Sequence, residues 1–214
     1  MAQFVFAPQE RVCLETWEVD EQKCCRENIK PDDCVLELGG RYGVVSYTIQ
    51  QILSDKKKHV VVEPDTFVHP YLERNRDDNK CEYHILKGIV SADDAYCFGF
   101  GAGKFTLGPD VLKINNEHMF RQRIGDFSVV KGFTWDNIEE SFGMKFNVII
   151  ADMEGSFPGF IKDNVDKLEQ INTIIYEQDG IPPNQYQDTE NLLISKGFSL
   201  VNMVGGQRIF KRLN

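Results

Sequence analysis

Two short stretches decide the fold: CVLELGGRYG (34–43) and HVVVEPD (59–65). Each is an apolar run of strand length that ends in an acid, Glu37 in the first and Glu63 in the second. Glycines follow the first acid, and residues 44–54 then carry apolar side chains at helical spacing. The pattern predicts a buried strand, a glycine turn, a helix and a second buried strand, which is how a parallel α/β sheet begins.

The rest of the chain continues this alternation. A closing pair of β runs is joined by Gly205-Gly206, which predicts an antiparallel hairpin over 198–212. We interpret 99–108 as a loop and 127–135 as one or two strands. Further strands are expected at 81–86, 146–151 and 172–177, and further helices at 9–30, 66–75, 156–170 and 186–196.

Composition favours one ordinary globular domain. The chain has 214 residues, 42% hydrophobic content and a formal net charge of −9. The acidic balance argues against a non-specific nucleic-acid partner. We expect no membrane span and no secretory leader, because no apolar run is long enough. The six cysteines include no CxxC pair, which argues against a structural zinc site. A cytoplasmic protein with reduced thiols is the expectation.

The glycine turn does not match the common nucleotide fingerprints. A dinucleotide-binding G-x-G-x-x-G counted from Gly39 needs glycines where the sequence has Arg41 and Val44. The stretch GFGAGKF (99–105) has no Ser or Thr after its lysine, so it is not a P-loop. What remains is an acid-x-G-x-x-x-G pattern followed by a second acid at the next strand end.

That remaining pattern resembles the class I S-adenosylmethionine-dependent methyltransferases. A closer resemblance, to the FkbM-type methyltransferases, rests on two later motifs: Asp152-x-Glu154-Gly155 after one strand and Glu177 after another. The sequence departs from that family's first motif, with Glu37 for Asp, Gly40 for Ala and Arg41 for Asn. The length of the chain predicts one domain over 1–214. The resemblance runs from about residue 30 to the end and implies a Rossmann-like fold. It also implies a mostly parallel seven-stranded sheet, helices on both faces and a C-terminal antiparallel hairpin.

The resemblance also implies a cofactor, S-adenosyl-L-methionine, and roles by position. Glu37 would lie near the methionine amino group, and Glu63 would accept hydrogen bonds from the ribose hydroxyls. The implied cofactor-binding residues are Glu37, Gly39, Gly40, Arg41, Tyr42, Gly43, Glu63, Pro64, Asp65, Gly88, Ile89 and Asp152.

The implied reaction is O-methylation of a sugar, glycan or small-molecule hydroxyl, which needs a general base. Asp152 is the first candidate, Glu154 the second, and His118 a third, from a segment that could cover the site. A magnesium ion is an open alternative, with Asp152, Glu177 and Asp179 as candidate ligands.

Three further possibilities stay open at this point. Methylation of nitrogen is one, and a non-catalytic scaffold domain that kept the fold is another. The third is that the chain is one domain of a larger glycan-processing protein.

The acceptor site is expected to be shaped by two segments, the N-terminal helical segment 1–30 and the insertion 91–145.

Overall fold

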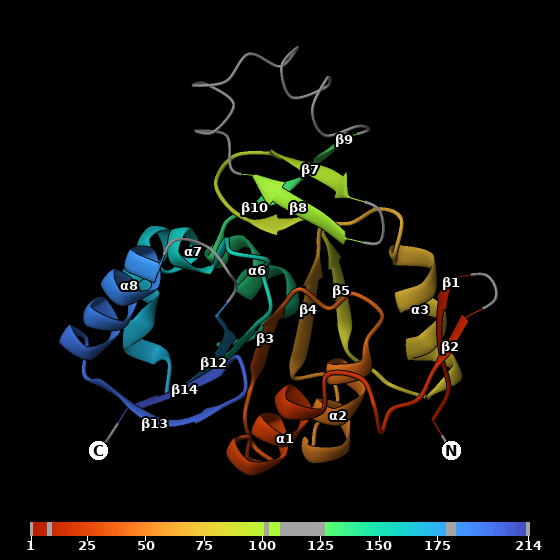
Figure 1. The fold of residues 1–214 in the computed structure, drawn as a ribbon, viewed down its shortest axis with the longest axis horizontal. Coiled ribbons are helices and arrows are strands. Elements are labelled where there is room, and N and C mark those ends of the chain that lie inside the picture. The colour runs from red at the N-terminus through yellow and green to blue at the C-terminus, as the bar shows by residue number, and fades with distance from the viewer. Residues whose placement is uncertain (1, 8–9, 101–102, 108–126, 179–182, 213–214) are drawn as a thin grey trace.

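A seven-stranded sheet forms the centre of the molecule (Figure 1). The computed structural model describes residues 2–7, 10–100, 103–107, 127–178 and 183–212. The strand order is β13-β14-β12-β11-β3-β4-β5, and every pairing is parallel except those of β14, which is antiparallel to both neighbours. The strands are β3 (Val35–Leu38), β4 (His59–Glu63), β5 (His84–Lys87), β11 (Val148–Ala151), β12 (Thr173–Glu177), β13 (Phe198–Val204) and β14 (Gln207–Arg212).

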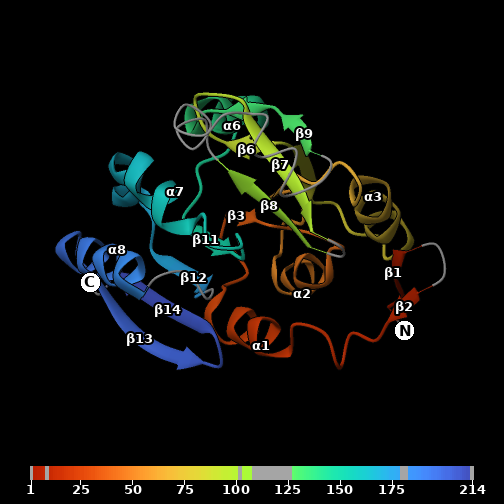
Figure 2. The same ribbon diagram turned by 45° about the horizontal axis from the view of Figure 1, so that its top comes forward.

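Helices cover both faces of this sheet (Figure 2). One face carries α1 (Val19–Asn28), α2 (Val44–Ile52) and α3 (His69–Asp78). The other carries α6 (Trp135–Phe142), α7 (Phe157–Asp163), the 3-10 helix η1 (Val165–Gln170) and α8 (Pro183–Ser195).

Side-chain alternation along the strands explains why these stretches are almost wholly apolar. Val35, Ile150 and Ile175 pack toward α1 and α2, whereas their neighbours Leu36 and Ile149 pack toward α6, α7 and α8. Because both faces are covered, both sets of side chains are buried, as in other parallel sheets. The predicted fold class is confirmed.

The chain order places a topological switch point between β3 and β11. From β3 the chain proceeds outward through β4 and β5, then returns to β11 on the opposite side and proceeds outward through β12. Crossover connections therefore leave β3 and β11 in opposite directions. In open α/β sheets, ligands bind at the carboxyl ends of the strands at such a point.

The expected helix over 9–30 is wrong in its first part. Glu10–Val12 form a strand, β2, that pairs antiparallel with β1 (Phe4–Ala7), and α1 begins only at Val19. The backbone of Val5 is bound by the side chain of Asn75 in α3, at 2.9 Å to its N–H and 3.2 Å to its carbonyl. Phe4 is buried in one cluster with Val68, so tertiary contacts hold β1 in place. Pairing with β1 then overrides the helix preference of Glu10–Val12.

The expected loop over 99–108 is also wrong. The insertion forms a three-stranded antiparallel sheet of β7 (Ala95–Phe100), β8 (Gly103–Leu107) and β9 (Phe127–Val130). This sheet lies above the ends of β4 and β5 at the top of Figure 1. Glycine content suggested a loop, but pairing between strands satisfies the backbone whatever the side chains are.

Two short strands join this insertion to the main body. β6 (Ile89–Val90) pairs in parallel with β10 (Gly132–Phe133), so the expectation of one or two strands within 127–135 is confirmed. Within the described residues, no helix combines the length and apolar character that crossing a membrane requires.

Candidate functional site

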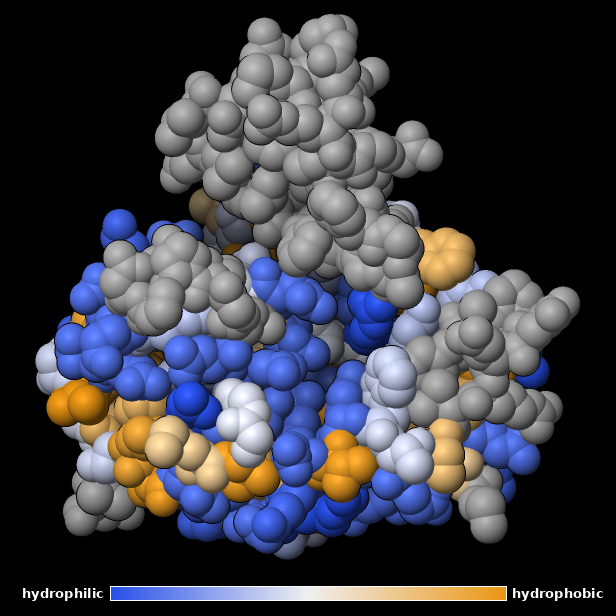
Figure 3. All heavy atoms as spheres, viewed as in Figure 1, coloured by the Kyte–Doolittle hydropathy of each residue, from blue (hydrophilic) through white to orange (hydrophobic). Residues whose placement is uncertain are grey.

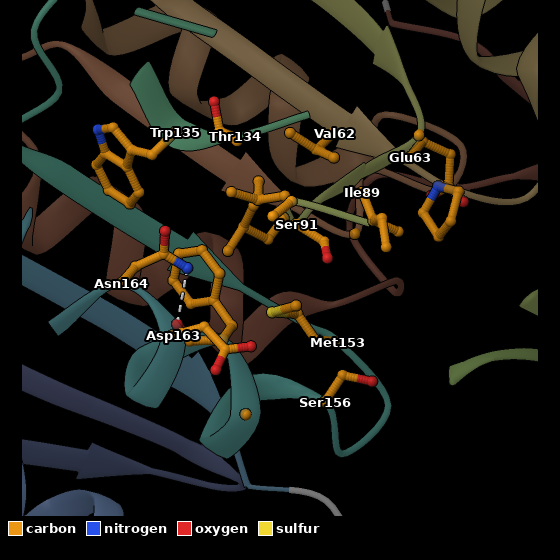
Figure 4. A pocket seen from close by; sticks show the side chains of 18 of the residues that line it. Val62, Glu63, Ile89, Ser91, Thr134, Trp135, Met153, Ser156, Asp163 and Asn164 are labelled. Atoms are coloured by element: carbon orange, nitrogen blue, oxygen red, sulfur yellow. Dashed lines mark hydrogen bonds between the residues drawn. The ribbon is translucent and has the colours of Figure 1, made fainter. Parts of the chain in front are cut away.

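A cavity of about 940 Å³ opens at the carboxyl ends of β3, β4 and β11, at the switch point. Figure 4 shows its side chains, with Glu63 and Ile89 on one side and Asp163 and Asn164 on the other. The cavity brings together many residues that the sequence singled out. These are Gly39, Arg41, Glu63, Pro64, Asp65, Gly88, Ile89, Asp152, Glu154 and Gly155.

The turn after β3 holds three strand ends together. Gly39 has φ 92°, and a Cβ on it would lie 1.8 Å from the main-chain oxygen of Asp152. Its N–H donates to the carbonyl of Val62 at 2.9 Å, while the N–H of Asp152 donates to the carbonyl of Leu38 at 2.9 Å. Only glycine combines this conformation with such close approach, which explains the first position of the motif.

Glu63 ends β4 at the cavity wall and is almost fully buried. One carboxylate oxygen accepts the N–H of Arg41 at 2.7 Å, and the other accepts the N–H of Asp65 at 2.6 Å. Burial raises the pKa of Glu63 to about 7, against the lowering effect of these two amides. The carboxyl group is therefore fixed in orientation by backbone and can change its charge near neutral pH.

Glu37 lies elsewhere. Its carboxylate accepts a hydrogen bond from Ser46 Oγ at 2.8 Å and lies 2.7 Å from His59 Nε2, and all three side chains are buried. Three predicted residues of the turn also do not line the cavity: Gly40, Tyr42 and Gly43. The structure therefore divides the predicted cofactor-binding residues into a cavity group and a supporting group.

The segment after β11 supplies the predicted catalytic side. Asp152 and Glu154 both line the cavity, and Glu154 has a left-handed backbone with φ 47°. Glu177, at the end of the neighbouring strand β12, instead lines a separate pocket. His118 and Asp179 lie outside the described residues.

The candidate magnesium ligands are not brought together in the part of the chain that the structure describes. No three His, Cys, Asp or Glu side chains there are placed to hold a metal ion.

The cavity is strongly acidic. Its basic lining residues are Arg41 and Lys167, and the Lys167 ammonium pairs with Asp136 at 2.6 Å and Asp166 at 3.3 Å, contacts that raise its pKa. Such a lining favours a cationic ligand over a polyphosphate. The acids along the wall are Glu63, Asp65, Asp93, Asp136, Asp152, Glu154, Asp163 and Asp166.

Part of the cavity could not be predicted. The end of α7 with the start of η1 (163–167) lines it, although that segment is distant in sequence from the glycine turn. Thr134 and the start of α6 line it too, from within the insertion 91–145 that is expected to shape the acceptor site. Hydrophilic side chains predominate over the middle of the face in Figure 3, and hydrophobic ones gather along its lower edge.

Comparisons with solved structures agree on the architecture. The chain is similar to an O-methyltransferase from Bacillus cereus, solved in complex with S-adenosylhomocysteine (SAH), with TM-score 0.55, 10% identity and coverage of 95% of this chain and 84% of that one. It is similar to a methyltransferase from Pyrococcus furiosus, with TM-score 0.54, 15% identity and coverage of 98% and 88%. A precorrin-6y C5,15-methyltransferase from Geobacter metallireducens GS-15 gives TM-score 0.52, 8% identity and coverage of 97% and 91%.

Sequence comparisons add no family. No protein-family model matches the chain, and no curated protein matches it, so the FkbM-type resemblance is not confirmed. Identities this low establish the fold and nothing finer. The chain has the Rossmann-like fold of the methyltransferases to which it is similar.

Proposed function

We propose that this chain is an S-adenosylmethionine-dependent methyltransferase that modifies a hydroxyl group. The observation that carries the proposal is the position of Glu63, a buried carboxylate at the wall of an acidic cavity at the switch point. Solved methyltransferases of the same fold, one of them holding S-adenosylhomocysteine, support it.

The residues of the cavity fit this cofactor. Glu63 offers carboxylate oxygens to the two ribose hydroxyls, since its backbone partners fix its orientation. Ile89 and Val62 supply apolar surface on the same side, suited to the adenine ring. The acidic lining stabilises the positive charge of the sulfonium.

Asp152 is proposed as the general base. It lines the cavity at the end of β11, and the turn at Gly39 fixes its main chain. When bound, the cofactor supplies an activated methyl group on a cationic sulfur, and transfer leaves the neutral thioether. Asp152 takes the proton of the acceptor hydroxyl as the oxygen lone pair forms the new bond to carbon.

The acceptor class is the finer part of the proposal. We propose a sugar, glycan or small-molecule hydroxyl as the acceptor and an FkbM-type relationship, on the basis of the Asp152-x-Glu154-Gly155 and Glu177 motifs. A place within a larger glycan-processing protein is proposed with them. Methylation of nitrogen and a scaffold without turnover are the competing functions. Magnesium is the least supported alternative, because its candidate ligands Asp152 and Glu177 line separate pockets and the third, Asp179, lies outside the described residues.

The test is calorimetric titration of the purified protein with S-adenosylmethionine and S-adenosylhomocysteine, with and without magnesium. Micromolar binding is expected. Binding of neither compound would remove the cofactor assignment and favour the scaffold function. Binding without methyl transfer to any hydroxyl or amine in an acceptor panel would point to a scaffold that kept the cofactor.

Asp152→Asn separates a base from a cofactor ligand. The amide cannot take a proton but keeps the shape of the side chain, so kcat should fall by about 10²–10⁴-fold while the Kd for S-adenosylhomocysteine changes little. Single-turnover methyl transfer and calorimetry on the same preparation measure both. Equal losses in rate and affinity would make Asp152 a cofactor ligand.

A further inference from the structure

A second pocket, of about 290 Å³, lies where the first turn of α1 meets the end of β12 and the start of β14. Glu18, Asp20 and Glu21 line it from α1 and the residue before it, and Glu177 and Gln207 line it from the sheet. We call this the α1 pocket. The remaining lining residues are Thr16, Val19 and Gly206. It shares none of its lining residues with the large cavity.

The strand pattern explains how these polar groups reach one place. Ile175 and Ile209 pack toward α1, so alternation turns Glu177 and Gln207 toward the same helix one step further along. The two residues are also direct cross-strand partners. Apolar side chains therefore pack under the middle of α1, and polar side chains line the pocket under its first turn.

The side chain of Gln207 has a hydrogen-bond acceptor in this pocket that no residue in the described part of the chain satisfies. Its side chain is only 4% exposed, and its Oε1 atom has no hydrogen-bond partner among the described residues. A buried amide oxygen without a donor destabilises the folded chain. A bound donor in the α1 pocket would remove that cost.

Two acids of the pocket, Glu18 and Glu21, have no ion-pair partner among the described residues. Glu21 is only 4% exposed. Burial raises the pKa of Glu18 to about 7 and raises that of Glu21 well above its usual range. The charges of Glu18, Asp152, Glu37 and Glu177 add to the effect on the pKa of Glu21.

The geometry favours an organic cation over a metal ion. A metal ion needs three or more ligand atoms at short distances from one point, and no such group is found among the described residues. Guanidinium and ammonium groups carry several N–H donors on a larger frame, and they bind carboxylates and amide oxygens that are spread around a pocket.

We infer that the α1 pocket binds a guanidinium or ammonium group, and that this group belongs to the methyl acceptor. The second half rests on the proposed function. Glu177 ends β12, whose neighbour in the sheet is β11, and Asp152, the residue that follows β11, lines the large cavity. An acceptor held by its cationic end at Glu21 and Gln207 can therefore extend past Glu177 toward the base.

The probe is n-butylguanidinium, titrated into the full chain in the presence and absence of saturating S-adenosylhomocysteine. n-Butylurea, which has nearly the same shape without the charge, is the control ligand. We expect the cation to bind at least tenfold more tightly than the urea. Equal binding of the two ligands would overturn the inference.

Two variants locate the binding. Glu21→Gln removes a buried acid and Gln207→Met removes the unpartnered oxygen, and each should weaken n-butylguanidinium binding by about fivefold or more. Glu140→Gln, on the exposed side of α6, is the matched control and should change nothing. A cation that binds all three variants as it binds the parent protein would place the site elsewhere and overturn the inference.

S-adenosylhomocysteine binding is measured in every variant and shows that the protein is folded. Normal binding of that compound with no guanidinium binding would overturn the inference and leave the proposed function standing. Guanidinium binding without any cofactor binding would retain the α1 pocket as a cation site and remove its link to methyl transfer. If millimolar magnesium or calcium displaced the organic cation and bound more tightly, the α1 pocket would be a metal site and the inference would be overturned.

Discussion

A buried glutamate lies near the end of β3 and another at the end of β4, but the two carboxylates have different surroundings. Glu63 is the last residue of β4 and Glu37 the last but one of β3, and both are buried, with Glu37 at 2% and Glu63 at 5% exposure. The sheet register separates them: Glu37 pairs with Val61, so Glu63 lies two residues further toward the carboxyl edge. One carboxylate is enclosed by the side chains of Ser46 and His59, and the other reaches the cavity.

The difference teaches that burial and a strand end do not by themselves make a ligand-binding acid. Each carboxylate oxygen of Glu37 has one partner among the side chains of α2 and β4, and Glu37 does not line the cavity. Glu63 is held from the backbone, through the N–H groups of Arg41 and Asp65, and keeps lone pairs for a ligand. The sharpest predictions therefore concern these two strand ends and the turn between them.

The largest effect is expected from Gly39→Ala, which would break the junction of β3, β4 and β11. The new methyl group overlaps the main-chain oxygen of Asp152, and φ 92° is unfavourable for alanine. The free energy of unfolding should fall by more than about 4 kcal/mol, as measured by urea denaturation.

Gly143→Ala is the matched control for that variant. Gly143 has a left-handed backbone, with φ 64°, at the end of α6, and a Cβ added there would have no atom of the described residues within 4 Å. Only backbone strain remains, so the loss should be about 1 kcal/mol. Similar losses in the two variants would show that the close contact at Gly39 contributes nothing.

Glu37→Ala should act mainly on stability. It removes a buried carboxylate and leaves Ser46 and His59 without their shared partner, at a cost of about 3 kcal/mol in the free energy of unfolding. Affinity for S-adenosylhomocysteine, measured by calorimetry on the folded fraction, should change less than threefold. A stable variant that lost most of its affinity would instead support a role at the methionine amino group.

Glu63→Ala should show the reverse pattern. Loss of the ribose hydrogen bonds is expected to cost about 2 kcal/mol of binding, or roughly 30-fold in Kd for S-adenosylhomocysteine. Glu82→Ala, which changes an exposed glutamate before β5 and away from the cavity wall, provides the control. Unchanged affinity in folded Glu63→Ala protein would remove the proposed placement of the cofactor.

The sequence predicted these strand ends because a buried parallel strand has a simple signal, a short apolar run bounded by polar residues. It could not predict their relative register, which depends on pairing and decides that Glu63 and not Glu37 reaches the cavity. It also missed the hairpin at 4–12, which depends on contacts with α3. The α1 pocket is formed by segments about 190 residues apart, Glu18 and Gln207, and no local pattern links them.

The smallest effect, and the one that best tests the setting of Glu63, is the pH dependence of binding. The pKa of the ligand-free carboxyl is raised to about 7, so at pH 6 most of the protein carries a neutral Glu63 and at pH 8 most carries the carboxylate. Ribose hydroxyls are donors to the ionised form, and binding below pH 7 must first remove a proton. Apparent affinity for S-adenosylhomocysteine should therefore be about tenfold weaker at pH 6 than at pH 8. Glu63→Gln, which does not titrate, should bind weakly at both values, and an equal dependence in that variant would assign the titration to another group.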